Sequence, residues 1–328
     1  MKENSEKDKG FFAVDEKMTS GMVDELNERF EKGLDRYFDD LGGLKKEFSE
    51  RVDCPNCGEK EGRQFIQKRF SYVRCAGCGM VYCSPRLNSE VNTRIHSRET
   101  YIEHFKFKVI PSIDYRRDVL ARRKYEQLMG FFKGPGRVID IGCGLGEVLS
   151  VFQENGWDAM GVDFNEFAIE YAREKFGVKI INKDIFELDM PEKFDLVMLW
   201  GVLEHVYEPF KLLEKARSIL KPDGLMLVEV PSADSVLVRY CEGTGTEAHR
   251  TFESARHIML FSRKALVGMC ARSGFSCEKL VSNGLDITTL CRMKSLDMSP
   301  ELSGRLQKML DDSLQGDLLR GFFRKEEK

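Results

Sequence analysis

Long apolar runs and a strong net charge are both absent from this sequence of 328 residues. No window of about eighteen consecutive apolar residues occurs, which argues against a membrane-spanning helix. The first residues are polar and charged and lack the apolar core of a signal peptide, so we expect a cytoplasmic protein with no membrane partner. The net charge is −3, whereas proteins that bind nucleic acid over a large surface are basic, so nucleic acid is not the expected partner.

The small net charge hides an uneven distribution along the chain. Residues 1–50 carry 9 Lys and Arg against 14 Asp and Glu, residues 51–125 carry 16 against 8, and the remainder carries 26 against 32. The basic middle segment favours a small anionic partner, such as a phosphate-bearing substrate. A solvated basic surface that binds nothing explains the same pattern equally well.

Four of the ten cysteines form two copies of one pattern. Cys54 and Cys57 are separated by two residues and followed by a glycine, as are Cys75 and Cys78. Tetrahedral zinc takes four soft ligands, and a two-residue gap lets each pair bind the ion from one tight turn. We therefore predict a zinc ribbon over residues 51–86 with these four cysteines as ligands. The zinc is expected to be structural, because four thiolates leave no open coordination position.

From residue 137 onward, short apolar segments alternate with amphipathic ones, which predicts a doubly wound α/β sheet. The predicted strands are 137–141, 159–162, 178–181, 194–200 and 225–230, and the predicted helices are 147–155, 165–176, 209–220 and 262–273. Two further strands, 275–281 and 287–291, are expected to close the sheet as a hairpin. We divide the chain into a helical segment (1–50), the ribbon (51–86), a helical basic region (87–136), a cofactor domain (137–292) and a helical tail (293–328).

The first strand of this series runs into a glycine-rich loop. Asp140 is followed by Gly142, Gly144 and Gly146, and a helical pattern then begins. Glycines let the backbone approach a ligand closely, and the helix start offers unpaired N–H groups. These features predict a nucleotide-like cofactor. A dinucleotide fingerprint has Gly or Ala three positions after its second glycine, where this chain has Glu147.

The loop resembles motif I of the class I S-adenosylmethionine-dependent methyltransferases, and the resemblance continues in order over residues 137–292. The matching stretches are Asp163, Asp184-Ile185, and residues 199–206, 220–224 and 256–262. The resemblance implies a seven-stranded Rossmann-like methyltransferase sheet carrying the ribbon and helical extensions, with S-adenosylmethionine as cofactor. It implies a cofactor site formed by Asp140, Gly142, Cys143, Gly144, Gly146, Asp163, Phe164, Asp184, Ile185 and Trp200.

A ribbon that precedes such a domain resembles a subgroup that includes sugar C-methyltransferases. This likeness and the basic segment imply an S-adenosylmethionine-dependent methyltransferase acting on a small anionic metabolite such as a nucleotide-linked sugar. His205 follows the fourth strand and is the candidate base for methyl transfer by direct displacement, with Glu204 orienting it. His257 is a second candidate. The alternative is a purely structural role for all three side chains in their loops.

Two alternatives remain open from the sequence. Some RNA methyltransferases also carry an N-terminal zinc ribbon, although the acidic composition and the absence of an Asn-Pro-Pro-Tyr-type motif after the fourth strand argue against one. A non-catalytic protein that keeps the cofactor fold for assembly is the other alternative. Carbon, oxygen and nitrogen acceptors share the same cofactor machinery, and the sequence is compatible with an oligomer.

Overall fold

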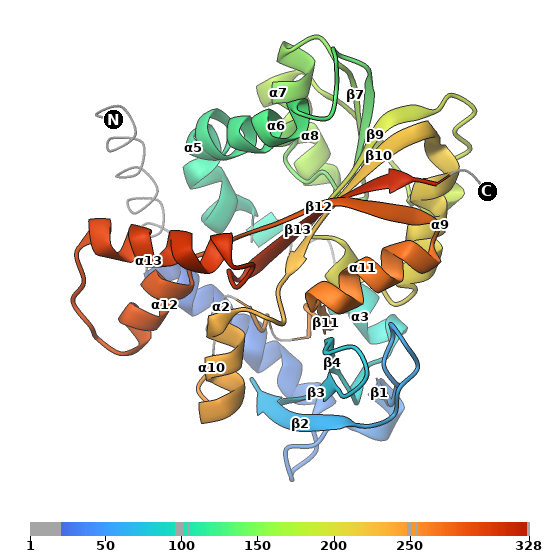
Figure 1. The fold of residues 1–328 in the computed structure, drawn as a ribbon. Helices are drawn as coiled ribbons and strands as arrows, with labels where there is room; N and C mark the ends of the chain where they lie inside the picture. Colours follow the sequence, from blue (N-terminus) through green and yellow to red (C-terminus); the bar gives the residue numbers. More distant parts are fainter. Residues whose placement is uncertain (1–20, 96–101, 104, 248–250, 254, 327–328) are drawn as a thin grey trace. The chain divides into compact units, whose positions relative to one another are not determined.

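The computed structural model describes residues 21–95, 102–103, 105–247, 251–253 and 255–326 (Figure 1). The chain divides into two compact units, one of residues 1–36 and 93–196 and the other of residues 37–92 and 197–328. Residues 1–20 of the predicted N-terminal helical segment lie outside the described residues. Among the described helices, none is long and apolar enough to cross a membrane.

The first unit contains three parallel strands with helices between them. The strands are β6 (Arg137–Ile141), β7 (Asp158–Asp163) and β8 (Lys179–Asn182), and β7 pairs with both of the others. Helix α7 (Glu147–Glu154) follows β6, and helix α8 (Glu166–Phe176) follows β7. Asn165 caps α8 by accepting a hydrogen bond from the Ala168 N–H, and left-handed Gly177 ends it.

The remaining described elements of the first unit are helical. They are α2 (Gly21–Leu34), α3 (Ser89–Ile95, which begins in the second unit), η3 (Phe105–Val109), η4 (Ile110–Ser112), α5 (Ile113–Tyr115), η5 (Arg116–Ala121), α6 (Arg122–Met129) and η6 (Ile185–Glu187). Buried Val109, Ile113, Leu145 and Ala168 pack together, with the half-buried Phe105 ring against them. This apolar cluster fixes the helices around residue 110 to the glycine loop and α8.

The second unit contains a small antiparallel sheet in the order β11-β4-β3-β2. Its strands are β2 (Gly62–Gln67), β3 (Phe70–Cys75), β4 (Val81–Cys83) and β11 (Met259–Leu260). The first three belong to residues 51–86, which we call the cysteine segment, whereas β11 comes from far along the chain. Met259 pairs with Tyr82 and Leu260 with Val81. Strands β2 and β3 form an antiparallel hairpin, and β4 pairs antiparallel with β3.

The second unit also holds the C-terminal half of the chain. Its other elements are η1 (Asp35–Tyr37, which begins in the first unit), η2 (Lys46–Phe48), β1 (Ser49–Glu50), β5 (Arg86–Leu87), η7 (Leu203–His205), α9 (Pro209–Ile219), β10 (Leu220–Pro231), α10 (Val236–Thr244), α11 (Arg263–Arg272), β12 (Phe275–Asn283), α12 (Asp286–Met293), α13 (Pro300–Asp312) and β13 (Leu318–Lys325). Strand β13 pairs antiparallel with both β10 and β12.

The large sheet has seven strands in the order β12-β13-β10-β9-β6-β7-β8, where β9 is Phe194–Trp200. The α/β sheet predicted by the alternating pattern, and the seven strands implied by the resemblance, are therefore confirmed. Residues 196–199 of β9 are all buried, as in a strand covered on both faces.

Two predicted elements at the C-terminal end are wrong. The segment expected as a strand at 287–291 lies in helix α12, and the predicted helical tail ends at Asp312 and gives way to strand β13. Asp286 is fully buried at the start of α12, where its carboxylate accepts hydrogen bonds from the Leu237 and Asp317 N–H groups. These long-range contacts outweigh the strand preference of the β-branched residues that follow. Strand β13, most of whose side chains are buried, pairs with β12 in place of the predicted strand 287–291.

Candidate functional site

The glycine loop of the first unit has a left-handed backbone at each alternate glycine. The φ angles of Gly142, Gly144 and Gly146 are 73°, 53° and 74°. A Cβ on Gly146 would lie 2.9 Å from Val178 Cγ2 and 3.1 Å from Ala172 Cβ, so packing also requires glycine there. Helix α7 begins directly after Gly146 with no side-chain cap. The loop therefore presents main-chain groups to a ligand.

Two acidic side chains accompany this loop, Asp140 from the end of the preceding strand and Asp163 from the next one. Asp140 is 2% exposed, its Oδ1 has no hydrogen-bond partner in the described part of the chain, and burial raises its pKa well above the usual range. Asp163 accepts hydrogen bonds from the Gly144 N–H and the Asn165 N–H, both at 2.9 Å. Its role as a clamp on the glycine loop was not visible in the sequence.

Strand register places the predicted cofactor residues of the first unit at one edge of the sheet. Ile141 pairs with Val162, and Asp163 pairs with Asn182, two residues before Asp184. The Asp184 carboxylate accepts a hydrogen bond from the Phe186 N–H at 2.9 Å and is exposed, as is Phe164, whereas Cys143 and Ile185 are buried. The carboxyl ends of adjacent parallel strands are where α/β proteins bind ligands.

The donor set at this edge fits S-adenosylmethionine. A carboxylate oxygen accepts two hydrogen bonds, so both oxygens of Asp163 retain capacity for a pair of ribose hydroxyls. The orphaned Asp140 oxygen offers an acceptor under the loop, where an unpaired buried carboxylate is otherwise costly. The N–H groups of Gly142, Gly144 and Gly146 already donate to Val162, Asp163 and Cys143. The main-chain donors at this edge are therefore those of the first turn of α7, which no side chain caps.

Trp200, the remaining predicted cofactor residue, ends β9 and belongs to the second unit, whereas the residues above belong to the first. Its indole N–H donates to Met198 Sδ at 3.3 Å, and the Arg320 guanidinium lies 4.9 Å from its ring. Arg320 in turn pairs with buried Glu229. The assignment of Trp200 to the cofactor site stays a prediction.

The four cysteines of the predicted ribbon converge in the second unit. One ligand atom from each of Cys54, Cys57, Cys75 and Cys78 lies within 4.8 Å of the others. The Sγ atoms of Cys54 and Cys78 are 3.5 Å apart, as are those of Cys57 and Cys75. Zinc–sulfur bonds of about 2.3 Å place tetrahedral sulfurs about 3.8 Å apart, so this cluster fits zinc.

The other cysteines do not join this cluster. All ten lie in the described part of the chain, and each is a free thiol. The Cys83 Sγ donates to the Pro85 carbonyl at 3.4 Å, and burial raises its pKa to about 12. Cys83 is therefore a packing residue beside the cluster.

The two candidate bases meet in the second unit, although they lie far apart in the sequence. The ring centroids of His205 and His257 are 5.0 Å apart. The Nδ1 atom of His205 lies 2.9 Å from the Arg256 carbonyl, and that of His257 lies 2.7 Å from the Thr251 carbonyl. Because a carbonyl oxygen only accepts, both rings carry hydrogen on Nδ1, which leaves the lone pair of each neutral ring on Nε2.

Glu204 completes this group, which we call the histidine cluster (Glu204, His205 and His257). The Glu204 side chain is 4% exposed, its Oε1 lies 3.9 Å from His205 Nε2, and its Oε2 has no hydrogen-bond partner in the described part of the chain. Burial, reinforced by the charges of Glu229 and Glu253, raises the pKa of Glu204 to about 8. An unpaired buried carboxyl of this kind typically marks a functional position.

The cysteine segment holds the main chain of the histidine cluster. The Tyr72 hydroxyl donates to the His257 carbonyl at 3.1 Å, and the Cys83 N–H donates to the Ile258 carbonyl at 3.0 Å. The Ile258 N–H donates to the Glu204 carbonyl at 3.1 Å, which joins the two loops of the cluster. Sequence reasoning missed Tyr72, because nothing in an alternating strand marks one tyrosine as a support for a distant histidine.

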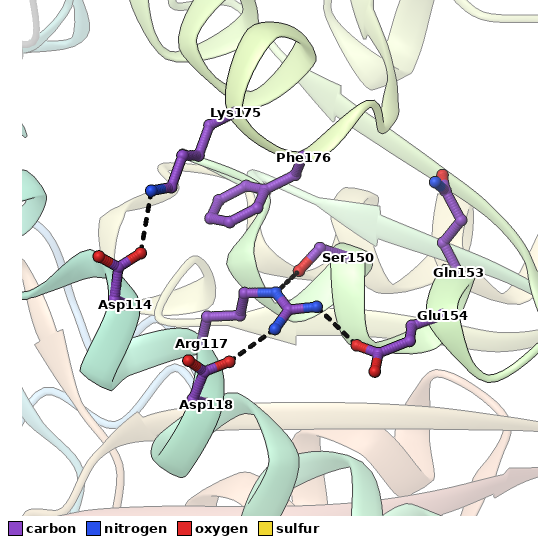
Figure 2. A pocket seen from close by; sticks show the side chains of 8 residues that line it. All are labelled: Asp114, Arg117, Asp118, Ser150, Gln153, Glu154, Lys175 and Phe176. Atoms are coloured by element: carbon purple, nitrogen blue, oxygen red, sulfur yellow. Dashed lines mark hydrogen bonds and ion pairs between the residues drawn. The ribbon is translucent and has the colours of Figure 1, made fainter.

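The basic region of the first unit lines a separate cavity of about 410 Å³ (Figure 2). Arg117 contacts Ser150, Asp118 and Glu154 there, and Lys175 pairs with Asp114 at 3.0 Å. Both cations that line the cavity are thus paired with acidic side chains. This cavity therefore adds no support for the expected phosphate-bearing substrate.

The central part of the chain is similar to known proteins. Residues 113–280 match the family model described as a methyltransferase domain. Over 123 residues the chain is 34% identical to a ubiquinone biosynthesis O-methyltransferase of Bradyrhizobium diazoefficiens, covering 35% of this chain and 48% of that protein. It is 32% identical over 141 residues to the protein of the same name from Cereibacter sphaeroides, covering 39% of this chain and 57% of that one. The chain thus spans about half the length of the curated relatives it matches.

A solved structure extends the likeness to the fold. It is the 1,6-didemethyltoxoflavin-N1-methyltransferase of Burkholderia thailandensis with bound 1,6-didemethyltoxoflavin and S-adenosylhomocysteine. The two structures align with a TM-score of 0.51 at 15% identity, covering 81% of this chain and 100% of the other. At this level of identity the comparison establishes a common fold.

Proposed function

The chain belongs to the methyltransferase-domain family, and we propose that it is an S-adenosylmethionine-dependent methyltransferase acting on a small anionic, phosphate-bearing metabolite such as a nucleotide-linked sugar. One observation carries the cofactor part of this proposal. Asp140, Asp163 and Asp184 lie at or just beyond the carboxyl ends of adjacent parallel strands, around a loop of left-handed glycines. This edge presents carboxylates and main-chain N–H groups together, which suits a ligand with both hydroxyl and ionic groups.

We assign the cofactor contacts from this arrangement. Asp163 accepts hydrogen bonds from the two ribose hydroxyls of the cofactor. Asp184 and Ile185 contact the adenine ring, and Asp140 and the glycine loop bind the amino acid end. Cys143, Phe164 and Trp200 contribute contacts around these groups. The cysteine segment binds one structural zinc ion through its four clustered thiolates.

The bound sulfonium supplies an activated methyl group, so the protein has to align an acceptor and remove its proton. His205 is the assigned base, because its Nδ1–H donates to the Arg256 carbonyl and its Nε2 lone pair accepts a proton. Glu204 orients His205, and His257 is the alternative base. The name of the curated relatives favours oxygen over carbon or nitrogen as the acceptor atom.

Calorimetry with S-adenosylmethionine tests the cofactor assignment directly. We expect Asp163→Ala to weaken binding by about 100-fold or more, because hydrogen bonds to a charged group contribute about 1.5–3 kcal/mol each. Asp158→Ala is the matched control, since this exposed residue begins the same strand and pairs with Arg137. Unchanged affinity in Asp163→Ala, or no binding by the wild type, would contradict the assignment.

A radiolabelled methyl assay tests the acceptor class. Label transferred to nucleotide-linked sugars would support the proposal. Label in RNA would redirect it to an RNA methyltransferase. Cofactor binding with no labelled product from sugars, RNA or cell extract would favour a non-catalytic protein.

A further inference from the structure

The histidine cluster is organised in a way that a single proton acceptor does not require. We propose that Glu204, His205 and His257 form a second metal centre, separate from the four cysteines, which binds one divalent first-row transition ion through two imidazoles and one carboxylate. The three residues offer ligand atoms that all lie within 4.8 Å of one another.

The orientation of both imidazoles supports this centre. Histidines that bind metals usually donate their other ring N–H to a carbonyl or carboxylate, which fixes the tautomer and directs the lone pair at the ion. His205 and His257 each do so, donating from Nδ1 to the carbonyls of Arg256 and Thr251. A single catalytic base explains one such arrangement, whereas a metal centre explains both.

The carboxylate supplies a second, independent observation. Glu204 is almost fully buried, and its Oε2 has no hydrogen-bond partner among the described residues. A buried carboxylate without a partner is costly, and a bound cation relieves that cost. Its Oε1 lies 3.9 Å from His205 Nε2, close to the about 3.4 Å that separates two ligands on a tetrahedral ion with bonds of about 2.1 Å.

The donor types indicate which ion binds. Imidazole nitrogen suits zinc, iron, nickel and copper, and cobalt(II) lies in the same series, whereas magnesium and calcium prefer oxygen alone. Three protein donors also leave open positions, as in catalytic rather than structural sites. If the proposed methyl transfer is correct, His205 would then be a ligand, and the ion would lower the pKa of a bound acceptor hydroxyl, whose proton would pass to water before the alkoxide takes the methyl group.

Cobalt binding to the full-length, tag-free protein tests this centre. One molar equivalent of zinc per chain is supplied first, which fills the four-thiolate site in preference to the three-donor histidine cluster, and Co²⁺ is then titrated with calorimetry and visible absorption. We expect one further Co²⁺ per chain, with weak visible bands and no sulfur-to-cobalt charge transfer. Glu204→Gln and His257→Gln each remove one of three donors, so we expect each to lower the affinity at least about tenfold.

Glu208→Gln is the matched control, because it makes the same chemical change at an exposed residue of the following loop. It should bind Co²⁺ as the wild type does. Zinc content and circular dichroism show whether each variant is folded, and either folded variant decides the question. No uptake at millimolar Co²⁺, unchanged affinity in a folded variant, or a thiolate charge-transfer band would overturn the proposal. S-adenosylmethionine is absent from the titration, so this result stands apart from the cofactor assignment.

Discussion

The glycine loop of the first unit and the histidine cluster of the second are held in place by different means. The loop is one continuous stretch, fixed by its own backbone conformation and by Asp163 from the next strand. The histidine cluster joins two loops distant in sequence, and its main chain is fixed by the cysteine segment through Tyr72 and Cys83. A change in the cysteine segment is therefore expected to alter the conformation of the histidine cluster, whereas the conformation of the glycine loop depends mainly on the loop's own residues.

Removing a cysteine ligand is the strongest way to test this contrast. We expect Cys75→Ser to lose the zinc and destabilise the cysteine segment by more than about 4 kcal/mol, the range reached when a structural metal is lost. Amides of residues 256–260 should lose protection together with the segment, because β4 pairs with β11. Hydrogen exchange and zinc content measure both effects.

Cys83→Ser is the control for this variant. Cys83 is buried in the same segment but lies outside the four-cysteine cluster. It should keep one zinc ion and the protection of residues 256–260. Equal losses in both serine variants would show that the packing of the segment, and not a metal, holds the histidine cluster.

Gly146→Ala tests the loop side of the contrast and has the next largest expected effect. The left-handed backbone costs an alanine about 1–2 kcal/mol. Its Cβ would also approach Val178 and Ala172 within about 3 Å, and such overpacking adds about 1–3 kcal/mol. Urea unfolding should therefore show a loss of about 2–5 kcal/mol in total, summed from these two effects.

Gly144→Ala separates backbone strain from packing in the same loop. A Cβ at Gly144 would meet only the Phe105 ring at 3.7 Å, an ordinary contact, so only the backbone cost of about 1–2 kcal/mol applies. Equal losses in the two alanine variants would mean that Val178 and Ala172 move aside, and the loop would then be less rigid than the structure indicates.

Most of the sheet could be predicted from the sequence because its pattern is local. Buried parallel strands read as short apolar runs, and the helices between them are amphipathic. The C-terminal end could not be predicted in the same way. Residues 287–291 are rich in β-branched side chains, yet the buried hydrogen bonds of Asp286 place them in a helix. Strand β13 is enclosed by β10 and β12, and no local signal shows that enclosure.

The candidate site divides in the same way. Repeated cysteine spacing and alternate glycines are short-range patterns, so the four-cysteine cluster and the glycine loop could both be predicted from the sequence. The sequence also singled out His205 and His257, but as rival bases. Only tertiary structure brings their rings together, orients both Nδ1 atoms toward carbonyls, and leaves the Glu204 Oε2 buried among the described residues without a partner.

The variant with the smallest expected effect is the most specific test of the link between the cysteine segment and the histidine cluster, because it removes a single hydroxyl group. Tyr72→Phe removes the hydrogen bond to the His257 carbonyl and should cost about 1 kcal/mol of stability. Tyr207→Phe is the control, since its hydroxyl donates to the Leu87 carbonyl and not to the histidine cluster. Both variants should unfold at slightly lower urea concentration. Only Tyr72→Phe should also weaken Co²⁺ binding, by about threefold, because outer supports orient metal ligands. Equal Co²⁺ affinities in the two variants would show that the cysteine segment stabilises the second unit without positioning His257.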